Sequence, residues 1–429
     1  MLQIYIESYG CSNNQAETEM IKAMLFSAGC SFTNNIDIAD ITIINTCVVK
    51  DKTINKIKRK IQDYSKKFDK GKKLIIAGCM PETLLKDIIK LSPNCSIIST
   101  HQIKKINTVV RKILEGKRII LVGKSNIIKC SLPKLRENKL ISITPISSGC
   151  DGQCSYCLAR LAKGKLFSYD MNDIIKSIEN DLQNGAKEIW LTSQDCANYS
   201  MDKEDKKQKL PELLNKILNL KHNFKLRLGM MDPNNILPIL DELIEIYKNK
   251  KIYKFLHIPI QSASNSVLKH MNRLYDIEEV ENIINKFRKQ FPDIVIATDI
   301  IVGYPTETNE DHKKNLDFIK KFKPDVFNLS KMSVHKGTPA GKLKPLNIDI
   351  INKRTTELME AHRKTASENK QKFLGKTIKV FVDMKRQGFF EARDENYNII
   401  ILVGDKILGK NIKIKIKEIG VHHMLGEII

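Results

Sequence analysis

The sequence has few aromatic residues and lacks any long apolar run. Phenylalanine, tyrosine and tryptophan make up 6% of its 429 residues, with a single tryptophan. The longest apolar runs, at 74–77 and 399–403, are far shorter than the roughly 20 residues that a membrane-spanning helix needs. The opening residues MLQIYIESYGC lack the basic-then-apolar layout of a secretory signal. We therefore expect a cytoplasmic, multidomain protein without a membrane segment.

Acidic residues are outnumbered by basic ones. The chain has 72 Lys and Arg against 49 Asp and Glu, a formal charge of +23. Such a charge attracts polyanions, so nucleic acid is the expected partner, although a coding bias towards Lys, Ile and Asn would also produce it. Ten cysteines without a secretion signal argue against a disulfide framework and favour metal binding or thiol chemistry.

The order of apolar segments predicts an α/β fold with three parts. In residues 1–125, β-branched runs at 2–8, 41–46 and 73–78 alternate with helical stretches at 14–28 and 53–68. This alternation is typical of a parallel sheet with crossover helices. Residues 126–139 are basic, contain a proline and are expected to form a linker.

Residues 140–372 repeat the strand–helix alternation over a longer stretch. Six such units predict a partial (β/α)6 barrel, since a closed barrel of this kind needs eight. The expected strands are 141–146, 188–193, 224–229, 254–260, 293–303 and 325–330, and a helix at 349–372 follows them. Residues 373–429 contain short alternating runs at 377–383, 388–393, 398–403 and 411–419, which predict a small C-terminal β-barrel.

Three cysteines lie close together after the first strand expected in the barrel. Cys150, Cys154 and Cys157 have the spacing C-x3-C-x2-C. Thiolates this close on one loop can bind adjacent irons of a cubane cluster and leave the fourth iron open. A structural zinc site would need a fourth ligand, and the neighbouring sequence contains no histidine. The spacing therefore favours an iron–sulfur cluster.

Three further cysteines are far apart in sequence but have a common position. Cys11, Cys47 and Cys79 each follow an expected strand directly, and the carboxyl ends of parallel strands lie at one edge of a sheet. A second three-cysteine cluster site is therefore predicted, although buried cysteines also occur at strand ends for packing reasons alone. Four cysteines without this arrangement are taken as structural thiols: Cys30, Cys95, Cys130 and Cys196.

The cysteine loop resembles the cluster motif of the radical S-adenosylmethionine (radical SAM) superfamily. A cysteine-triad α/β domain, this barrel and a terminal β-module resembling a TRAM domain, in that order, are similar to the methylthiotransferases over nearly the whole chain. The segments CSYCLARLAKGKLFSY, WLTSQDCANYS, FLHIPIQSASNSVLKHMNR and TDIIVGYPTET look most like the archaeal and eukaryotic members that act on N6-threonylcarbamoyladenosine in tRNA.

This resemblance implies a transferase that uses two 4Fe–4S clusters and S-adenosylmethionine. One S-adenosylmethionine molecule would methylate a sulfur on the second cluster, and another would yield a radical that abstracts hydrogen from C2 of the adenine next to the anticodon. The implied partners are tRNA carrying threonylcarbamoyladenosine, an electron donor and a sulfur donor, with a monomer as the expected state. The sequence does not distinguish threonylcarbamoyladenosine from a related hydroxynorvalylcarbamoyl substrate.

Polar residues at the ends of the barrel strands are the candidates for holding S-adenosylmethionine, because such barrels bind ligands at this end. The polar candidates are Ser193, Gln194, Asp195, Arg227, Gln261, Ser262 and Asp299. Tyr156, next to Cys157, is expected to pack beside a bound purine, and Gly303 to let the backbone approach the adenine. His257 is expected to be a core histidine. Lys163 stands where the family usually has arginine, which puts a bidentate contact there in doubt.

Three alternatives stay open at this point. The same chemistry could act on another tRNA adenosine or on an aspartate of a ribosomal protein, but the residues after Cys157 are unlike those of the latter enzymes. A non-catalytic, zinc-containing tRNA-binding protein is the alternative from another class. Anaerobic purification separates it from the enzymes, since zinc gives a colourless protein and clusters a brown one.

Overall fold

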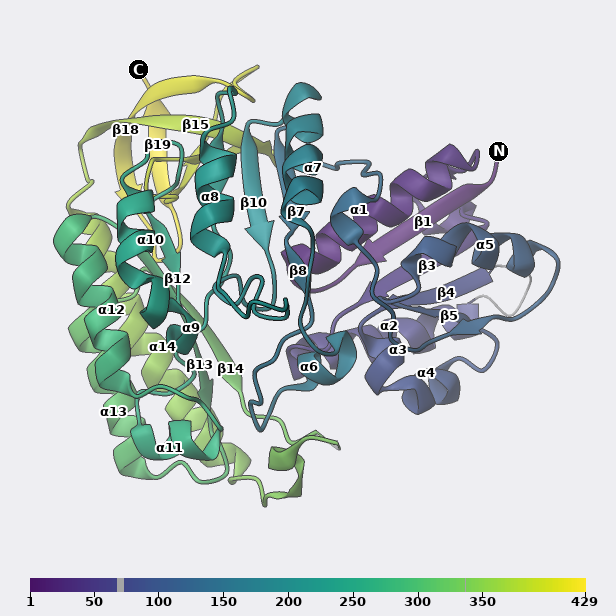
Figure 1. The fold of residues 1–429 in the computed structure, drawn as a ribbon, viewed down its shortest axis with the longest axis horizontal. Coiled ribbons are helices and arrows are strands. Elements are labelled where there is room, and N and C mark those ends of the chain that lie inside the picture. Colours follow the sequence, from purple (N-terminus) through teal and green to yellow (C-terminus); the bar gives the residue numbers. More distant parts are fainter. Residues whose placement is uncertain (68–72, 336) are drawn as a thin grey trace.

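The computed structural model describes residues 1–67, 73–335 and 337–429. Phe68, the last residue of the helix expected at 53–68, lies outside them. Figure 1 shows an α/β domain at the N-terminus, a half-open barrel in the middle and a small β-barrel at the C-terminus. The predicted α/β fold class is confirmed, while the domain boundaries at 125, 139 and 372 stay predictions. None of the helices in the described ranges combines the length and apolar character that a membrane crossing requires.

The N-terminal domain is a six-stranded parallel sheet in the order β2-β1-β3-β4-β5-β6. Its strands are β1 (Gln3–Ser8), β2 (Ser31–Phe32), β3 (Ile41–Thr46), β4 (Lys73–Gly78), β5 (Ser96–Ser99) and β6 (Ile120–Leu121). Its helices are α1 (Ser12–Ser27), α2 (Asp51–Lys67), α3 (Met80–Thr83), α4 (Leu85–Leu91) and α5 (Ile106–Leu114), with 3₁₀ turns at Ile36–Ile38 and Ile103–Lys105.

Both faces of this sheet are covered by helices. Ile43 of the fully buried strand β3 packs with α1 and α5, whereas its neighbour Ile44 packs with α2 and α4. Successive side chains of a strand point to opposite faces, so a central strand with two covered faces is apolar almost throughout. The three long strands predicted from sequence are β1, β3 and β4 in the middle of the sheet. Strands β2, β5 and β6, which lie at the two sides of the sheet, were not predicted.

The middle part consists of two parallel three-stranded halves, β11-β10-β7 and β12-β13-β14, linked by a bridge between Leu226 and Ile252. The strands are β7 (Ile141–Pro145), β10 (Glu188–Thr192), β11 (Lys225–Arg227), β12 (Phe255–His257), β13 (Val295–Val302) and β14 (Val326–Lys331). A short hairpin of β8 (Ser147–Ser148) and β9 (Phe167–Ser168) follows β7. The predicted six-stranded partial barrel is confirmed.

Helices surround the outside of this partial barrel (Figure 1). They are α7 (Met171–Gln183), α8 (Leu210–Leu218), α9 (Pro233–Ile236), α10 (Leu240–Tyr247), α11 (Asn265–His270), α12 (Ile277–Gln290), α13 (Asn309–Phe322) and α14 (Ile348–Gln371). Helix α6 (Leu158–Lys163) instead packs against α3 of the N-terminal domain. Three 3₁₀ turns lie at Lys129–Ser131, Leu237–Ile239 and Pro339–Lys342. Capping boxes start α12 at Asp276 and α13 at Thr308, which satisfies backbone N–H groups that a helix leaves free at its first turn.

The C-terminal part is a closed barrel in the order β15-β16-β17-β19-β18. Its strands are β15 (Thr377–Lys385), β16 (Phe390–Arg393), β17 (Ile399–Leu402), β18 (Asn411–Ile419) and β19 (Met424–Ile428). Four of the five were predicted from sequence, and β19 was not.

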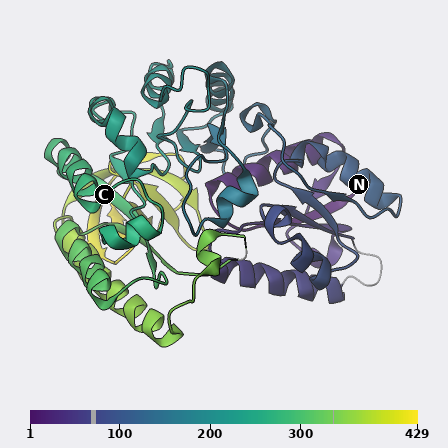
Figure 2. The ribbon, with the colours of Figure 1, turned by 60° about the horizontal axis from the view of Figure 1, so that its bottom comes forward.

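The two outer parts pack against different sides of the partial barrel. Helix α1 covers β7, and Ile141 and Ile143 of that strand share one apolar core with Met20 of the helix. Figure 1 shows the C-terminal barrel at the end where β7 and β10 begin. In Figure 2 it lies behind the partial barrel, while the N-terminal domain lies beside it.

The C-terminal barrel inserts one tyrosine into the base of the partial barrel. The ring centroid of Tyr397 lies 4.9 Å from that of Tyr253 and 5.1 Å from that of Phe255. The guanidinium group of Arg227 lies 5.3 Å from the Tyr397 ring, 5.0 Å from the Phe255 ring and 5.4 Å from the Trp190 ring. Arg227 therefore contacts the base of the barrel, and its role as a ligand of S-adenosylmethionine gains no support from these contacts.

Candidate active site

The first cysteine triad, Cys150, Cys154 and Cys157, lies on the loop between β8 and α6. The backbone N–H of Gly152 donates to Sγ of Cys150 at 3.2 Å, and that of Arg160 donates to Sγ of Cys157 at 3.4 Å. Burial, reinforced by the charge of nearby carboxylates and thiolates, raises the pKa of Cys150 to about 12. Thiolates in such a place need a positive partner, which the iron of a bound cluster would supply.

Arg273 is the positive group that faces this triad, and sequence reasoning did not identify it. Its Nη1 donates to Sγ of Cys154 at 3.1 Å, and its Nη2 lies 2.6 Å from a carboxylate oxygen of Asp232. Its Nε donates to the hydroxyl of Tyr275 at 3.0 Å. The arginine is held on three sides, so its charge is fixed beside the sulfur. It lies 119 residues from Cys154, and no local pattern relates the two positions.

The second cysteine triad, Cys11, Cys47 and Cys79, follows β1, β3 and β4 directly. The side chain of Asn14 lies between two of the thiols, with Oδ1 at 3.4 Å from Sγ of Cys11 and Nδ2 at 3.9 Å from Sγ of Cys79. A Cβ placed on Gly10 would lie 2.8 Å from Sγ of Cys47. Gly10 has φ +118°, so this close approach requires glycine. The structure brings the three predicted cysteines to one edge of the sheet.

Within the ranges that the structure describes, no set of three or more His, Cys, Asp or Glu side chains is arranged to hold one metal ion. A cubane cluster makes a different demand, because each of its protein ligands binds a different iron. Three thiols around a shared space, with N–H groups or a guanidinium donating to the sulfurs, suit that demand. Both triads fit a 4Fe–4S cluster in the chemistry of their donors.

Two of the residues predicted to bind S-adenosylmethionine at the ends of the barrel strands fix the loops around the first triad. The hydroxyl of Ser193 lies 2.6 Å from that of Ser147, next to the cysteine loop. Asp195 accepts hydrogen bonds from the backbone N–H of Asp232 at 3.0 Å and from Nδ2 of Asn235 at 2.6 Å. Burial, reinforced by the charge of Asp232, raises the pKa of Asp195 to about 7. The loops after β10 and β11 are thus joined.

One other predicted residue keeps a polar atom available, and two more are hydrogen-bonded within the protein. Oε1 of Gln194 is buried without a hydrogen-bond partner among the described residues, so a bound molecule can supply one. Gln261 has φ +63° and donates its backbone N–H to the carbonyl of Asp299 at 2.8 Å. The carboxylate of Asp299 lies 2.5 Å from Nε2 of His257. His257, predicted to be a core histidine, is half-buried and is paired with a site candidate.

The remaining candidates have contacts within the protein. The hydroxyl of Ser262 is buried and lies 3.5 Å from Oδ1 of Asn315. A Cβ on Gly303 would lie 2.5 Å from Cγ1 of Ile351 in α14, which explains a glycine here by helix packing. Tyr156 packs against an apolar cluster that includes Tyr304. None of these contacts tests whether the residues bind S-adenosylmethionine.

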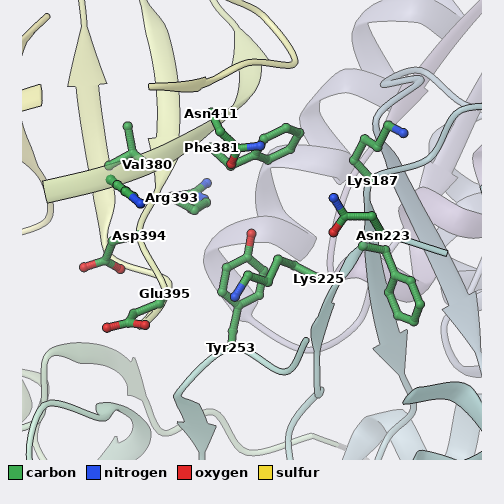
Figure 3. Close-up of a pocket in the computed structure, with 12 residues that line it drawn as sticks. Lys187, Asn223, Lys225, Tyr253, Val380, Phe381, Arg393, Asp394, Glu395 and Asn411 are labelled. Atoms are coloured by element: carbon green, nitrogen blue, oxygen red, sulfur yellow. The ribbon is translucent and has the colours of Figure 1, made fainter. Parts of the chain in front are cut away.

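Two cavities lie at opposite ends of the partial barrel. One of about 220 Å³ borders the first triad. It is lined by amide and charged groups that include Asn198, Asn234, Asn235, Asn272 and Arg273. The other, of about 270 Å³, lies between the base of the partial barrel and the C-terminal barrel (Figure 3). We call it the junction cavity. Its lining includes Lys187, Asn223, Lys225, Lys379 and Phe381.

Comparison with known proteins assigns a family to each of the two regions that contain these triads. Residues 3–100 match the family described as uncharacterized protein family UPF0004, and residues 144–319 match the radical SAM superfamily. The second triad lies in the first of these regions and the first triad in the second. The chain is therefore a radical SAM protein with a UPF0004 domain.

Curated relatives match the whole chain. A Pyrococcus horikoshii protein is 36% identical over 100% of both chains, and an Archaeoglobus fulgidus protein is 37% identical over 100% of this chain and 99% of its own. Both are named probable threonylcarbamoyladenosine tRNA methylthiotransferase. The human enzyme of that name is 32% identical over 99% of this chain and 74% of its own. The chain belongs to the threonylcarbamoyladenosine tRNA methylthiotransferase family.

Solved structures with this fold are more distant. The radical S-adenosylmethionine methyltransferase TsrM from Kitasatospora setae, solved with cobalamin and a 4Fe–4S cluster or with an S-adenosylmethionine analogue, is similar with a TM-score of 0.57 at 11–12% identity. The match to the analogue complex covers 80% of this chain and 75% of that one. At this identity the likeness concerns the fold alone.

Proposed function

We propose that this protein is a tRNA methylthiotransferase that converts N6-threonylcarbamoyladenosine, next to the anticodon, into its 2-methylthio derivative. The observation that carries the proposal is the presence of two separate three-cysteine sites in one chain whose full-length relatives bear that name. A reaction with one cluster gives no role to Cys11, Cys47 and Cys79. The other substrates considered from sequence are not favoured by any observation.

In this proposal each triad holds one 4Fe–4S cluster. S-adenosylmethionine held beside the first cluster would supply the radical on reductive cleavage. The chain contributes the donors around it: Arg273 holds positive charge at Cys154, and Asp195 ties the two neighbouring loops together. Gln194 and the Asp299–His257 pair offer polar atoms for the cofactor.

We propose that the junction cavity helps to hold tRNA. Figure 3 shows lysines from the partial barrel and residues of the C-terminal barrel facing one space. Phe381 is half-buried, and Lys187, Lys225 and Lys379 supply positive charge around it. RNA-binding sites combine such cations for phosphates with aromatic rings on which bases stack. The Lys379→Glu variant should raise the Kd for tRNA and leave cleavage of S-adenosylmethionine unchanged.

The other parts of the proposal follow from the chemistry. An electron donor and a sulfur donor are required, the protein acts as a monomer, and the cytoplasm, where tRNA is used, is the expected place of the reaction.

The test is a reaction of anaerobically purified protein, reconstituted with iron and sulfide, with S-adenosylmethionine, a reductant and tRNA carrying threonylcarbamoyladenosine. Mass spectrometry of the nucleosides should then detect the methylthio derivative. A colourless protein that binds zinc would refute the proposal. Formation of 5′-deoxyadenosine without methylthiolation of this tRNA would keep the enzyme class and refute the substrate.

A further inference from the structure

A buried cluster of charges lies between the two cysteine triads. The carboxylate oxygen Oε1 of Glu17, in α1, lies 2.6 Å from Nζ of Lys129 and 2.6 Å from Nζ of Lys163. The hydroxyl of Thr100 donates to the same oxygen at 2.6 Å and accepts from both lysines, at 2.7 and 2.9 Å. The side chains of the three charged residues are at most 3% exposed. The cluster joins the N-terminal domain, the linker and α6.

The charges of this cluster do not balance. Two ammonium groups face one carboxylate, which leaves one positive charge in a place without water. A buried charge without a partner costs several kcal/mol, so an anion is expected nearby. The sulfurs of the second triad lie beside this cluster: the side chain of Asn14, one turn before Glu17 in α1, lies 3.4 Å from Sγ of Cys11 and 3.9 Å from Sγ of Cys79. Thr100, which contacts both lysines, donates its backbone N–H to the carbonyl of Gly78, the residue before Cys79, at 2.8 Å.

The two lysines differ in their surroundings. Burial, which the attraction of Glu17 offsets only in part, lowers the pKa of Lys129 to about 8. Lys163 follows Ala162, which shares an apolar cluster with Cys79 and Met80, so its ammonium group is carried by the helix that packs beside this cysteine. An ion pair that only held α1 and α6 together would need a single lysine beside Glu17. The second cation is accounted for by the thiolates.

We propose that Lys163 is a positioning residue of the second cluster site, whose ammonium group neutralises charge on the sulfurs of Cys79 and Cys11. This inference rests on the proposed function, because it assumes that the second triad holds a cluster. The fixed positive charge favours addition of an electron to that cluster and so raises its reduction potential. Lys163 ends the helix that starts directly after Cys157, so one short helix carries a ligand of the first cluster and the cation of the second.

The test uses the full chain with the cysteines of the first triad changed to alanine, so that only the second cluster contributes signals. Lys163→Met in this background should shift the midpoint potential of the remaining cluster to a more negative value and change its EPR spectrum in the reduced state. Lys163→Arg keeps the charge and should retain the parent potential. An unchanged potential in Lys163→Met would refute the inference.

Lys134→Met is the matched control, because Lys134 makes an equally short ion pair, 2.6 Å from Asp181, with side chains 4% and 7% exposed. It should lower thermal stability without changing the potential. If Lys163→Met loses the cluster while Lys163→Arg keeps it, the charge is required for assembly, which supports the inference. If both lose it equally, the shape of lysine matters and the inference fails. Absence of any cluster in the parent background would instead refute the proposed function.

Discussion

Replacing Arg273 by methionine should weaken the first cluster selectively. The change removes the hydrogen bond from Nη1 to Sγ of Cys154, at 3.1 Å, and the ion pair with Asp232, at 2.6 Å. A hydrogen bond to a charged group is worth about 1.5–3 kcal/mol. Because the arginine side chain is 6% exposed, water can replace little of the lost hydrogen-bond energy. The affinity of the first triad for its cluster should fall by roughly 10- to 150-fold, since about 1.4 kcal/mol is a factor of ten.

The assay is iron content after reconstitution at limiting iron, together with formation of 5′-deoxyadenosine. Arg273→Met should lose about half of its iron and most of its S-adenosylmethionine cleavage, while the second cluster stays. Arg393→Met is the control, because Arg393 is equally buried and pairs with Asp383 at 3.1 Å within the C-terminal barrel, which contains none of the six cysteines. Wild-type iron content and cleavage in Arg273→Met would show that the guanidinium does not support the cluster.

Three further predictions concern the triads, the pH dependence of stability and the base of the barrel. Cys154→Ala should abolish 5′-deoxyadenosine formation, whereas Cys47→Ala should keep it and lose methylthiolation; full methylthiolation by Cys47→Ala would refute the second site. Burial raises the pKa of Glu19 to about 7 in the folded protein. Ionisation of this carboxyl therefore destabilises the folded state at any pH above the pKa of Glu19 in the unfolded chain. The loss in free energy of unfolding is about 3 kcal/mol and is complete above pH ~7. Glu19→Gln should therefore raise the Tm at pH ~8 and leave it unchanged at pH ~4; equal Tm changes at both would contradict this. Tyr397→Ala should lower the free energy of unfolding by about 3–5 kcal/mol in denaturant titration, and an unchanged midpoint would mean that the ring does not anchor the C-terminal barrel.

The cysteine arrangement was predictable because both patterns are tied to backbone geometry. Cys150, Cys154 and Cys157 lie within one loop, so their spacing alone limits their separation. The second triad is spread along the chain, but its members follow neighbouring parallel strands, and β1, β3 and β4 are adjacent in the sheet. Strand order in such a sheet is a consequence of its crossover connections, which the alternation of strands and helices reveals.

Groups that act through tertiary contacts could not be predicted in this way. Glu17 and Lys163 are 146 residues apart, and each looks like an ordinary charged residue of a helix. Short strands were also missed. Strand β19 contains Gly426, whose Cβ would lie 2.6 Å from Cδ1 of Ile414. Glycine weakens the sequence signal of a strand, although the crowded interior of the barrel requires it here.

The closure of the C-terminal barrel limits how this part of the protein can meet a partner. Strand β19 pairs parallel with β17 and antiparallel with β18, so the hydrogen-bonding groups of the backbone are used within the barrel. An extended peptide cannot add to such a sheet as another strand, because that mode of binding needs a free edge. Recognition by this barrel therefore falls to its side chains and loops, where substitutions can change the partner without disturbing the fold.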